Sequence, residues 1–208
     1  MTVDLRGLPA EEAAVRRFVR RLWLPYHREL EVTTEDHELD DEVDIVEEEV
    51  PFRLDRLDTE GYRLWVAVDD GGEPGDDSDD EGTDSTDCEG SADSTDSEAS
   101  TDTDVDPLAS TGGDLVGFVA TEVDRSPSVF DRPDRLVIGD LFVREGYRGT
   151  GLARDLVGRA TERAREADCD ELALDVHVDN DRAIAFYEKL GFEPRRHRMR
   201  VPVEVGNL

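Results

Sequence analysis

The stretch VREGYRGTGLARDL, which begins at Val143, joins an apolar run to a helical pattern through closely spaced glycines. Free N–H groups at the start of a helix bind anions well, and glycines leave those groups unobstructed. Arg148 and Arg154 add positive charge nearby. The stretch therefore predicts a site for a pyrophosphate group. It matches neither a Walker A loop nor the G-x-G-x-x-G spacing, so a plain strand-to-helix turn is the alternative on these residues alone.

A second stretch, DNDRAIAFYEKLGFEP, begins at Asp179, after the next strand pattern. Together, LFVREGYRGTGLA and NDRAIAFYEKLGF resemble the GCN5-related N-acetyltransferase (GNAT) family. Arg148, Gly151 and Ala153 match the R/Q-x-x-G-x-G/A element of that family. The second signature is matched by Asn180, Ala183, Phe186, Tyr187, Leu190, Gly191 and Phe192.

The resemblance implies an α/β GNAT fold, whose mostly antiparallel central sheet is splayed at the acetyl-CoA site and flanked by helices on both faces. The splay is expected after the strand that ends with Leu141, Phe142 and Val143, whose backbone groups bind the pantetheine arm. Asn180 is expected beside the pantetheine and Tyr187 near the sulfur. The pyrophosphate is expected at the N–H groups of Arg148, Gly149, Thr150, Gly151, Leu152, Ala153 and Arg154. On the residues alone, Leu141 and Val143 fit a core equally well, and Asn180 fits a helix cap.

The resemblance also implies direct attack of an amine on the thioester, in a ternary complex without a covalent enzyme intermediate. Tyr187 is the candidate acid that protonates the departing thiolate. The base is left open between Asp140, at the end of VIGD, and Asp175, in LALDVHV. Glu122 is a third candidate, and His177 shares a strand face with Asp175.

The acceptor is expected to be a primary amine on a small molecule, a protein N-terminus or a lysine side chain. Two other functions fit the same residues. One is a non-catalytic sensor that binds acyl-CoA, and the other is an interaction protein that acts through an acidic segment. No metal is expected, because the four histidines are scattered without ligand spacing.

The elements that position these residues alternate between strand and helix patterns. Strands are predicted at residues 2–8, 62–70, 114–123, 135–143 and 171–179, with a final edge strand at 195–203. Helices are predicted from Pro9 through the stripe Val15, Phe18, Val19 and Leu22, at 39–50 with an end at Pro51, at 152–164, and at 182–190.

Residues 71–112 interrupt this pattern with Asp, Glu, Ser, Thr and Gly, and no Lys or Arg occurs between Asp69 and Asp114. Such a segment buries too little apolar surface to offset chain entropy. We therefore predict one domain over residues 1–208, with a disordered acidic insertion between two strands. The spacing of Asp77, Asp79, Glu81 and Gly82 is similar to the start of an EF-hand loop. The last ligand position of such a loop falls on Cys88, and no helices flank the segment, so an acidic solvated loop is the better interpretation.

The whole chain is strongly acidic: its 208 residues carry a formal net charge of -30, and Lys189 is the only lysine. This composition is similar to that of cytoplasmic proteins from extreme halophiles. It argues against a nucleic-acid partner, which needs a basic patch. Two cysteines in different settings fit a reducing compartment. No secretory leader is expected, and no apolar run reaches membrane-spanning length. We expect a cytoplasmic protein, monomeric or homodimeric, without a membrane partner.

Overall fold

A computed structural model describes residues 2–34, 37–71 and 113–201. These residues contain one five-stranded sheet in the order β1-β2-β3-β4-β5. The strands are β1 (Val3–Gly7), β2 (Tyr62–Asp69), β3 (Asp114–Asp124), β4 (Arg135–Val143) and β5 (Glu171–Leu174). The first four pair in antiparallel fashion, and β5 pairs parallel with β4. The predicted mixed α/β fold with a mostly antiparallel sheet is confirmed.

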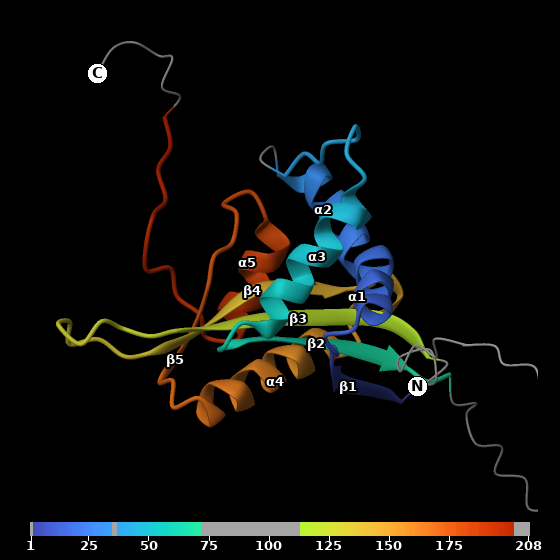
Figure 1. The fold of residues 1–208 in the computed structure, drawn as a ribbon. Coiled ribbons are helices and arrows are strands. Elements are labelled where there is room, and N and C mark those ends of the chain that lie inside the picture. Colours follow the sequence, from blue (N-terminus) through green and yellow to red (C-terminus); the bar gives the residue numbers. More distant parts are fainter. Residues whose placement is uncertain (1, 35–36, 72–112, 202–208) are drawn as a thin grey trace, which may run out of the picture.

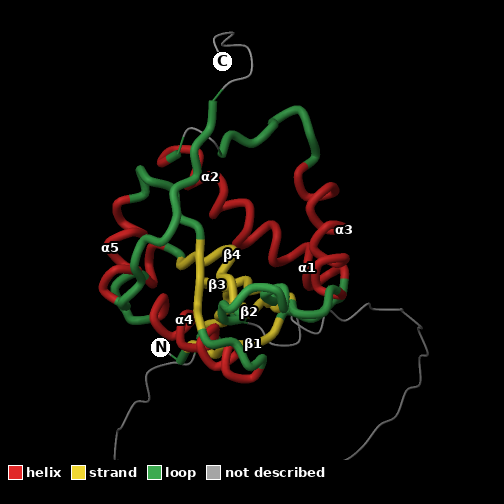
Figure 2. Tube along the Cα trace, turned by 90° about the vertical axis from the view of Figure 1, so that its left-hand side faces the viewer, coloured by secondary structure: helices red, strands yellow, loops and turns green. Residues whose placement is uncertain are grey.

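Helices cover both faces of the sheet (Figure 1). One face carries α1 (Glu12–Phe18), the π-helical turn η1 (Val19–Trp23), α2 (Leu24–Thr33) and α3 (Ile45–Asp58). The other face carries α4 (Leu152–Glu166), and α5 (Asp181–Lys189) packs into the same core as α4. Figure 2 shows the strands enclosed between these helices, with α5 and α3 on opposite flanks.

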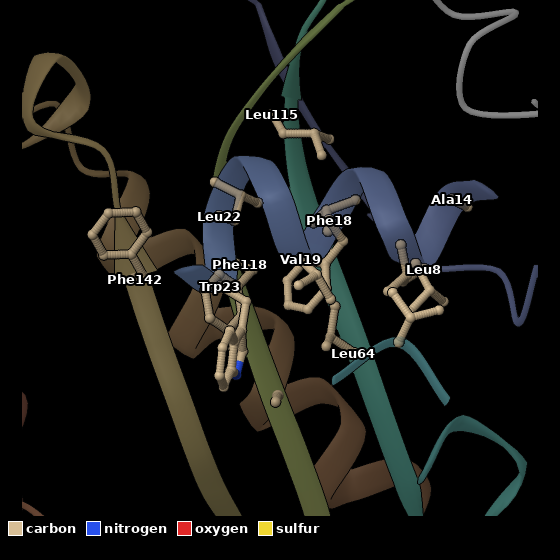
Figure 3. Packing of buried hydrophobic residues seen from close by; sticks show 14 of the residues in the cluster. Leu8, Ala14, Phe18, Val19, Leu22, Trp23, Leu64, Leu115, Phe118 and Phe142 are labelled. Atoms are coloured by element: carbon tan, nitrogen blue, oxygen red, sulfur yellow. The ribbon is translucent and has the colours of Figure 1, made fainter. Parts of the chain in front are cut away.

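The first core lies between the sheet and the continuous α1–η1 segment (Figure 3). Val15, Phe18, Val19 and Leu22 are fully buried there. The Phe18 ring meets Phe118 of β3 edge-on, with 5.0 Å between ring centroids, which is a favoured aromatic geometry. The spacing of these four residues predicted an amphipathic helix, and the structure confirms it.

The second core lies between the sheet and α4. It buries the predicted stripe of Leu152, Leu156, Val157, Ala160 and Ala164. Gly117 of β3 faces this core, where a Cβ atom would lie 3.5 Å from the side chains of Leu152 and Leu156 and only 2.9 Å from the carbonyl oxygen of Phe142 on β4. α4 packs on β3 and β4, and a short loop joins the end of β4 to its N-terminus.

Helix α3 begins and ends later than the predicted helix at 39–50. It begins at Ile45, where the Asp44 side chain accepts a hydrogen bond of 3.2 Å from the N–H of Glu47. It then runs through Pro51 to Asp58 instead of stopping at the proline. A proline removes one helical hydrogen bond, but the burial of Val50 and Arg53 against the sheet side keeps the helix intact.

Two strand predictions are wrong at the C-terminal end. β5 stops at Leu174, and residues 175–180 form no strand. The alternating pattern placed Val176 and Val178 on one strand face with Leu172 and Leu174. In the structure these two valines are 36% and 76% exposed. Residues 195–201 are exposed and form no strand, and 202–203 lie outside the described residues. A strand needs a partner edge for its backbone groups, and β4 has already separated from β5 at this point.

The predicted acidic insertion lies outside the described residues except for Gly71, as do the EF-hand-like residues and Cys88. The residues on either side belong to the sheet. Asp69 at the end of β2 and Asp114 at the start of β3 are cross-strand partners. The segment therefore joins two adjacent antiparallel strands.

Candidate active site

The sheet opens between β4 and β5. Their pairing ends at Ile138 and Leu174, whereas β4 continues to Val143 while paired only with β3. The opening was expected after residues 141–143. The structure places it earlier, after Ile138, so these three residues line the gap. Their backbone groups on that side face an edge that no described strand covers, which is an arrangement that accepts an extended amide-bearing ligand.

A β-bulge at Gly139 sets the direction of the next side chain. Ala120 pairs with Asp140 but Thr121 pairs with Ile138, so Gly139 is the extra residue. Leu136 and Ile138 therefore face α4, whereas Phe142 packs with the α1–η1 core. Without the bulge, Asp140 would follow Ile138 onto the α4 face. Bulges redirect side chains in this way beside many active sites.

The glycine-rich stretch forms a short 3₁₀ turn, η2 (Glu145–Tyr147), followed by a loop into α4. Gly149 and Gly151 have φ angles of 79° and 104°, which side-chain-bearing residues rarely adopt. A Cβ atom at either position would meet nothing within 4 Å. Gly151 is the N-cap of α4 and offers no side-chain cap, so the first N–H groups of that helix stay open to an anion.

Arg148 is held from two sides at the mouth of the opening. Its Nε donates a 3.0 Å hydrogen bond to the carbonyl of Val143, and its Nη2 contacts Glu29 of α2 at 2.5 and 2.8 Å. Glu29 also pairs with Arg182 of α5 at 3.0 Å. One carboxylate thus connects α2, the loop and α5. The sequence analysis did not select Glu29 or Arg182, and no motif marks Glu29.

Across the opening, α5 carries Asn180 and Tyr187. Asn180 is the N-cap of α5, and its Oδ1 accepts a 3.1 Å hydrogen bond from the N–H of Ala183. Its side-chain nitrogen keeps two donors for another partner. The Tyr187 ring packs on Phe186 and Phe192, with centroid separations of 5.1 and 5.4 Å. Burial, together with the negative charge of Asp140, raises the pKa of Tyr187 to about 12. The phenol is therefore protonated at neutral pH and able to donate.

Asp140 lies at the centre of a polar cluster on the α1–α3 side. Its Oδ2 is 3.7 Å from Nη2 of Arg53 on α3. Tyr26 of α2 lies close by, and its pKa is raised by burial first and by Asp140 next. Burial also lowers the pKa of the neighbouring His27 to about 4, so that ring is neutral in the folded protein. Tyr26, His27 and Arg53 were not selected from the sequence.

A hollow of about 230 Å³ connects this cluster to the surface. It runs between α3 and the strands β3 and β4. Its lining consists of Phe52, Arg53, Arg56, Tyr62, Ala120, Thr121, Glu122, Val137, Gly139 and Asp140. Gly139 and Asp140 in its lining directly follow Ile138, where β4 stops pairing with β5. The hollow therefore lies next to the start of the open edge of β4.

Comparison with known protein families gives a match over more than half of the chain. A family profile described as "Acetyltransferase (GNAT) family" matches residues 78–192, which is more than half of the chain. The chain belongs to the acetyltransferase (GNAT) family. The expected family and its class of enzyme are thus confirmed.

Individual relatives of this GNAT chain match only in part. N-alpha-acetyltransferase 30 from Homo sapiens is 35% identical over 85 residues, which cover 41% of this chain and 23% of the relative. The chain thus spans only about a quarter of that relative's length.

Two solved structures share the fold over almost their whole length. A tetramutant of the BH1408 protein from Bacillus halodurans superposes with a TM-score of 0.65 at 17% identity, over 96% of this chain and 99% of that one. The complex of AAC(6')-Iy with the bisubstrate analog CoA-S-monomethyl-acetylneamine gives a TM-score of 0.55 at 15% identity, over 97% and 98%. At these identities the likeness shows the GNAT fold alone.

Of the remaining predicted residues of the GNAT site, Asp175 and His177 lie apart from Asp140, whereas Glu122 lines the same hollow. The Asp175 side chain follows β5, is 90% exposed and contacts Arg198 at 3.4 Å. His177 approaches Asp179 at 3.4 Å in the same segment. Glu122 does line the hollow, where it pairs with Arg56 at 2.9 Å. Of the three candidate bases, only Asp140 contributes to the environment of Tyr187.

The backbone and side chain of Leu152 serve different purposes. Its side chain is buried in the α4 core, so only its N–H faces the loop. Arg154 is exposed, and its N–H donates to the carbonyl of Gly151 at 2.8 Å.

Within the described residues no group of acidic, histidine or cysteine side chains is arranged to hold a metal ion. Nor is any described helix long and apolar enough to span a membrane.

Proposed function

We propose that the protein is an N-acetyltransferase that moves an acetyl group from acetyl-CoA to a primary amine. One observation carries the proposal: the negative charge of Asp140 on β4 acts on Tyr187 of α5 at the point where the sheet opens. A carboxylate and a protonated phenol on the two sides of a gap are a base and an acid for one reaction.

The residues present fit acetyl-CoA as the co-substrate, which supplies an acetyl group on a thiol leaving group. The free edge of Leu141–Val143 is suited to the amide-rich pantetheine arm. The open N-terminus of α4, after Gly149 and Gly151, is suited to the pyrophosphate. The two spare N–H donors of the Asn180 side chain are suited to a carbonyl group of the pantetheine arm. These roles follow the family resemblance and the geometry described above.

The two proposed catalytic residues move one proton each. Asp140 accepts one proton from the ammonium form of the acceptor, directly or through water, and the neutral amine then attacks the acyl carbon. Tyr187 gives its proton to the sulfur as the carbon–sulfur bond breaks, and the second proton that the nitrogen loses on becoming an amide returns to the phenolate or to solvent. The charge of Asp140 supports this division of roles, because a nearby carboxylate favours the protonated form of the phenol, which is the form that can donate.

The hollow between α3 and β3–β4 is the proposed acceptor site. It leads to Asp140 without crossing the cofactor edge of β4. Arg56 pairs with Glu122 in its lining, which leaves the Asp140 carboxylate as the group that an incoming amine meets. The resemblance to N-alpha-acetyltransferase 30 favours a protein N-terminus over other amines.

The test is acetylation of an amine panel at molar salt. The panel contains a peptide with a free N-terminus, the same peptide blocked at its N-terminus but carrying a lysine, a polyamine and an aminoglycoside. Thiol release and product mass identify the acceptor. We expect turnover on the free N-terminal peptide, with strong losses in Asp140→Asn and Tyr187→Phe variants. Tight binding of acetyl-CoA with no turnover on any amine would instead indicate a non-catalytic acyl-CoA sensor.

A further inference from the structure

Arg53 is a buried guanidinium that the proposed reaction does not yet use. It lies on α3 with only 8% of its surface exposed, and it forms part of the acceptor hollow. Arginine is rarely buried to this extent unless partners hold it. Its Nε donates to Glu49 one turn earlier on α3, and its Nη1 donates to the Tyr62 hydroxyl at 3.0 Å. Its guanidinium carbon also lies 5.7 Å from the ring centre of Trp23.

These contacts fix the plane of the guanidinium and leave Nη2 facing Asp140. The separation of 3.7 Å from Oδ2 is longer than a hydrogen bond. Arg53 therefore attracts the carboxylate without occupying its lone pairs. A carboxylate held this way stays free to accept a proton from another group. A direct two-point pair would have used both oxygens.

The charges of Arg53, Glu49 and Asp140 also suit a cationic acceptor in the hollow. When all three groups are ionised, Arg53 carries one positive charge against the negative charges of Glu49 and Asp140. Burial raises the pKa of Glu49, and Arg53 opposes that rise. One negative charge is left over at the inner end of the hollow. A cationic ammonium group on the acceptor would balance it.

We propose that Arg53 is a positioning residue that holds the Asp140 carboxylate in the acceptor hollow, oriented toward the incoming amine. The proposal rests on the proposed function, in which Asp140 is the base. It explains why a charged side chain is buried beneath a hollow and anchored by Glu49 and Tyr62. The alternative is a purely structural ion pair that joins α3 to β4 and has no effect on proton transfer.

A double-mutant cycle separates the two readings. Arg53→Met, Asp140→Asn and the combination are compared in kcat/KM for the acceptor amine. Arg53→Met is expected to lose about 10- to 100-fold, as a displaced catalytic group does. The combination is expected to be no worse than Asp140→Asn alone, because Arg53 acts through Asp140. Independent, multiplied losses would overturn the proposal. Full activity of Asp140→Asn would remove the base itself, and with it both the proposed mechanism and this role.

The pH profile gives a readout that a structural role does not move. The charged and titratable groups around Asp140 are Tyr26, His27, Glu49, Arg53, Tyr62 and Tyr187. At high pH the acceptor amine loses its own proton, so the base is no longer needed. The defects of Arg53→Met and Asp140→Asn are expected to shrink together as the pH rises. A defect in Arg53→Met that is constant with pH would contradict the proposal.

Two further variants guard against misfolding. Arg53→Lys keeps the charge but loses the planar fork, so it is expected to recover part of the activity lost in Arg53→Met. Arg16→Met removes a different ion pair of α3, the one between Arg16 of α1 and Glu47, and is expected to behave as wild type. A crystal structure of Arg53→Met needs no acceptor. A displaced Asp140 carboxylate is expected there, and an unmoved one would overturn the proposal.

Discussion

Tyr187 and Asp140 show how surroundings assign opposite roles to two ordinary side chains. Burial keeps Tyr187 in its neutral form, and the charge of Asp140 strengthens the effect. Asp140 in turn is directed toward the hollow by the Gly139 bulge and the nearby guanidinium of Arg53. A phenol that holds its proton at neutral pH is present in the form that can donate to a departing thiolate.

Replacing Tyr187 with phenylalanine tests this role. The ring contacts with Phe186 and Phe192 remain, and only the hydroxyl is lost. General-acid catalysis contributes about 10²–10⁴ in rate, so kcat is expected to fall within that range. The KM for acetyl-CoA is expected to change much less, because the lost interaction forms in the transition state. Steady-state kinetics on the identified amine measure both. A folded variant with nearly wild-type kcat would return Tyr187 to a packing role.

His27 makes a prediction about stability and pH. Its Nε2 is buried without a hydrogen-bond partner among the described residues, and its ring lies 4.1 Å from Trp23 between centroids. The folded pKa of about 4 lies below the value near 6.5 expected for an unfolded chain. As the pH falls below 6.5, the unfolded state gains a proton that the folded state refuses. The stabilisation present at neutral pH is therefore lost between about pH 6.5 and 4.

The measurement compares urea unfolding of wild type and His27→Gln at several pH values and constant salt. The difference in unfolding free energy between the two proteins is expected to change by about 2 kcal/mol across that interval. His197→Gln, at an exposed position, is the matched control and is expected to track wild type. If wild type and His27→Gln lose stability in parallel, His27 does not titrate as stated.

The sequence could identify only part of this residue set. Tyr187, Asn180 and the Gly149–Gly151 loop stand in local motifs, so their types and spacing are visible along the chain. Arg53, Tyr26 and Glu29 come from α2 and α3, which carry no such motif. They reach β4 or its loop only after the chain folds, and a buried arginine cannot be told from a surface one in an acidic helix.

At the level of elements, the site depends on where β4 parts from β5 and on how α4 begins. The sequence indicated both elements, because a long apolar strand and a strongly amphipathic helix have clear patterns. It misplaced the separation, since pairing partners are not encoded in local alternation. The same reason explains the overextended strand at 171–179, and the proline in α3 shows burial overriding a local stop signal.

The loop before α4 can be tested with a pair of variants. Gly151→Glu places a carboxylate at the proposed pyrophosphate site, where no protein atom would meet a Cβ within 4 Å. Gly151→Ala carries the same backbone strain at a φ of 104° without the charge. We expect Gly151→Glu to weaken acetyl-CoA binding at least about tenfold more than Gly151→Ala, through repulsion and blockage. Calorimetry at fixed salt measures both. Equal affinities would place the phosphates elsewhere.

At the scale of the molecule, strong acidity coexists with a proposed site for an anionic cofactor. Arg148, Arg154 and Arg182 lie around the mouth of the opening, and Glu29 pairs with two of them. This local arrangement offsets a net charge of -30 near the proposed phosphate site. The sequence revealed the acidity and the motif, but not that a carboxylate from α2 would lie among those arginines.

The segment between β2 and β3 is the largest feature without an assigned part in the reaction. Its ends are fixed by the fold, since Asp69 and Asp114 are cross-strand partners. Asp69 also accepts a 2.5 Å hydrogen bond from the Tyr147 hydroxyl in the turn before the glycine loop. Gly113 accepts one from Arg17. These anchors lie close to the proposed cofactor site, so any contribution of the segment should appear first in acetyl-CoA binding.

Replacing residues 72–112 with a short Gly-Ser link tests that contribution. The link leaves Asp69, Gly71 and Gly113 in place and closes two strands whose ends already pair. We expect acetyl-CoA affinity and the thermal midpoint at molar salt to stay close to wild type, because the removed residues are mostly Asp, Glu, Ser, Thr and Gly and offer little apolar surface. At low salt the midpoint is expected to rise, because fewer like charges repel one another. Tyr147→Phe, which removes the nearby hydrogen bond but keeps the segment, is the matched control. A loss of affinity in the shortened chain that exceeds the loss in Tyr147→Phe would show that the segment takes part in cofactor binding.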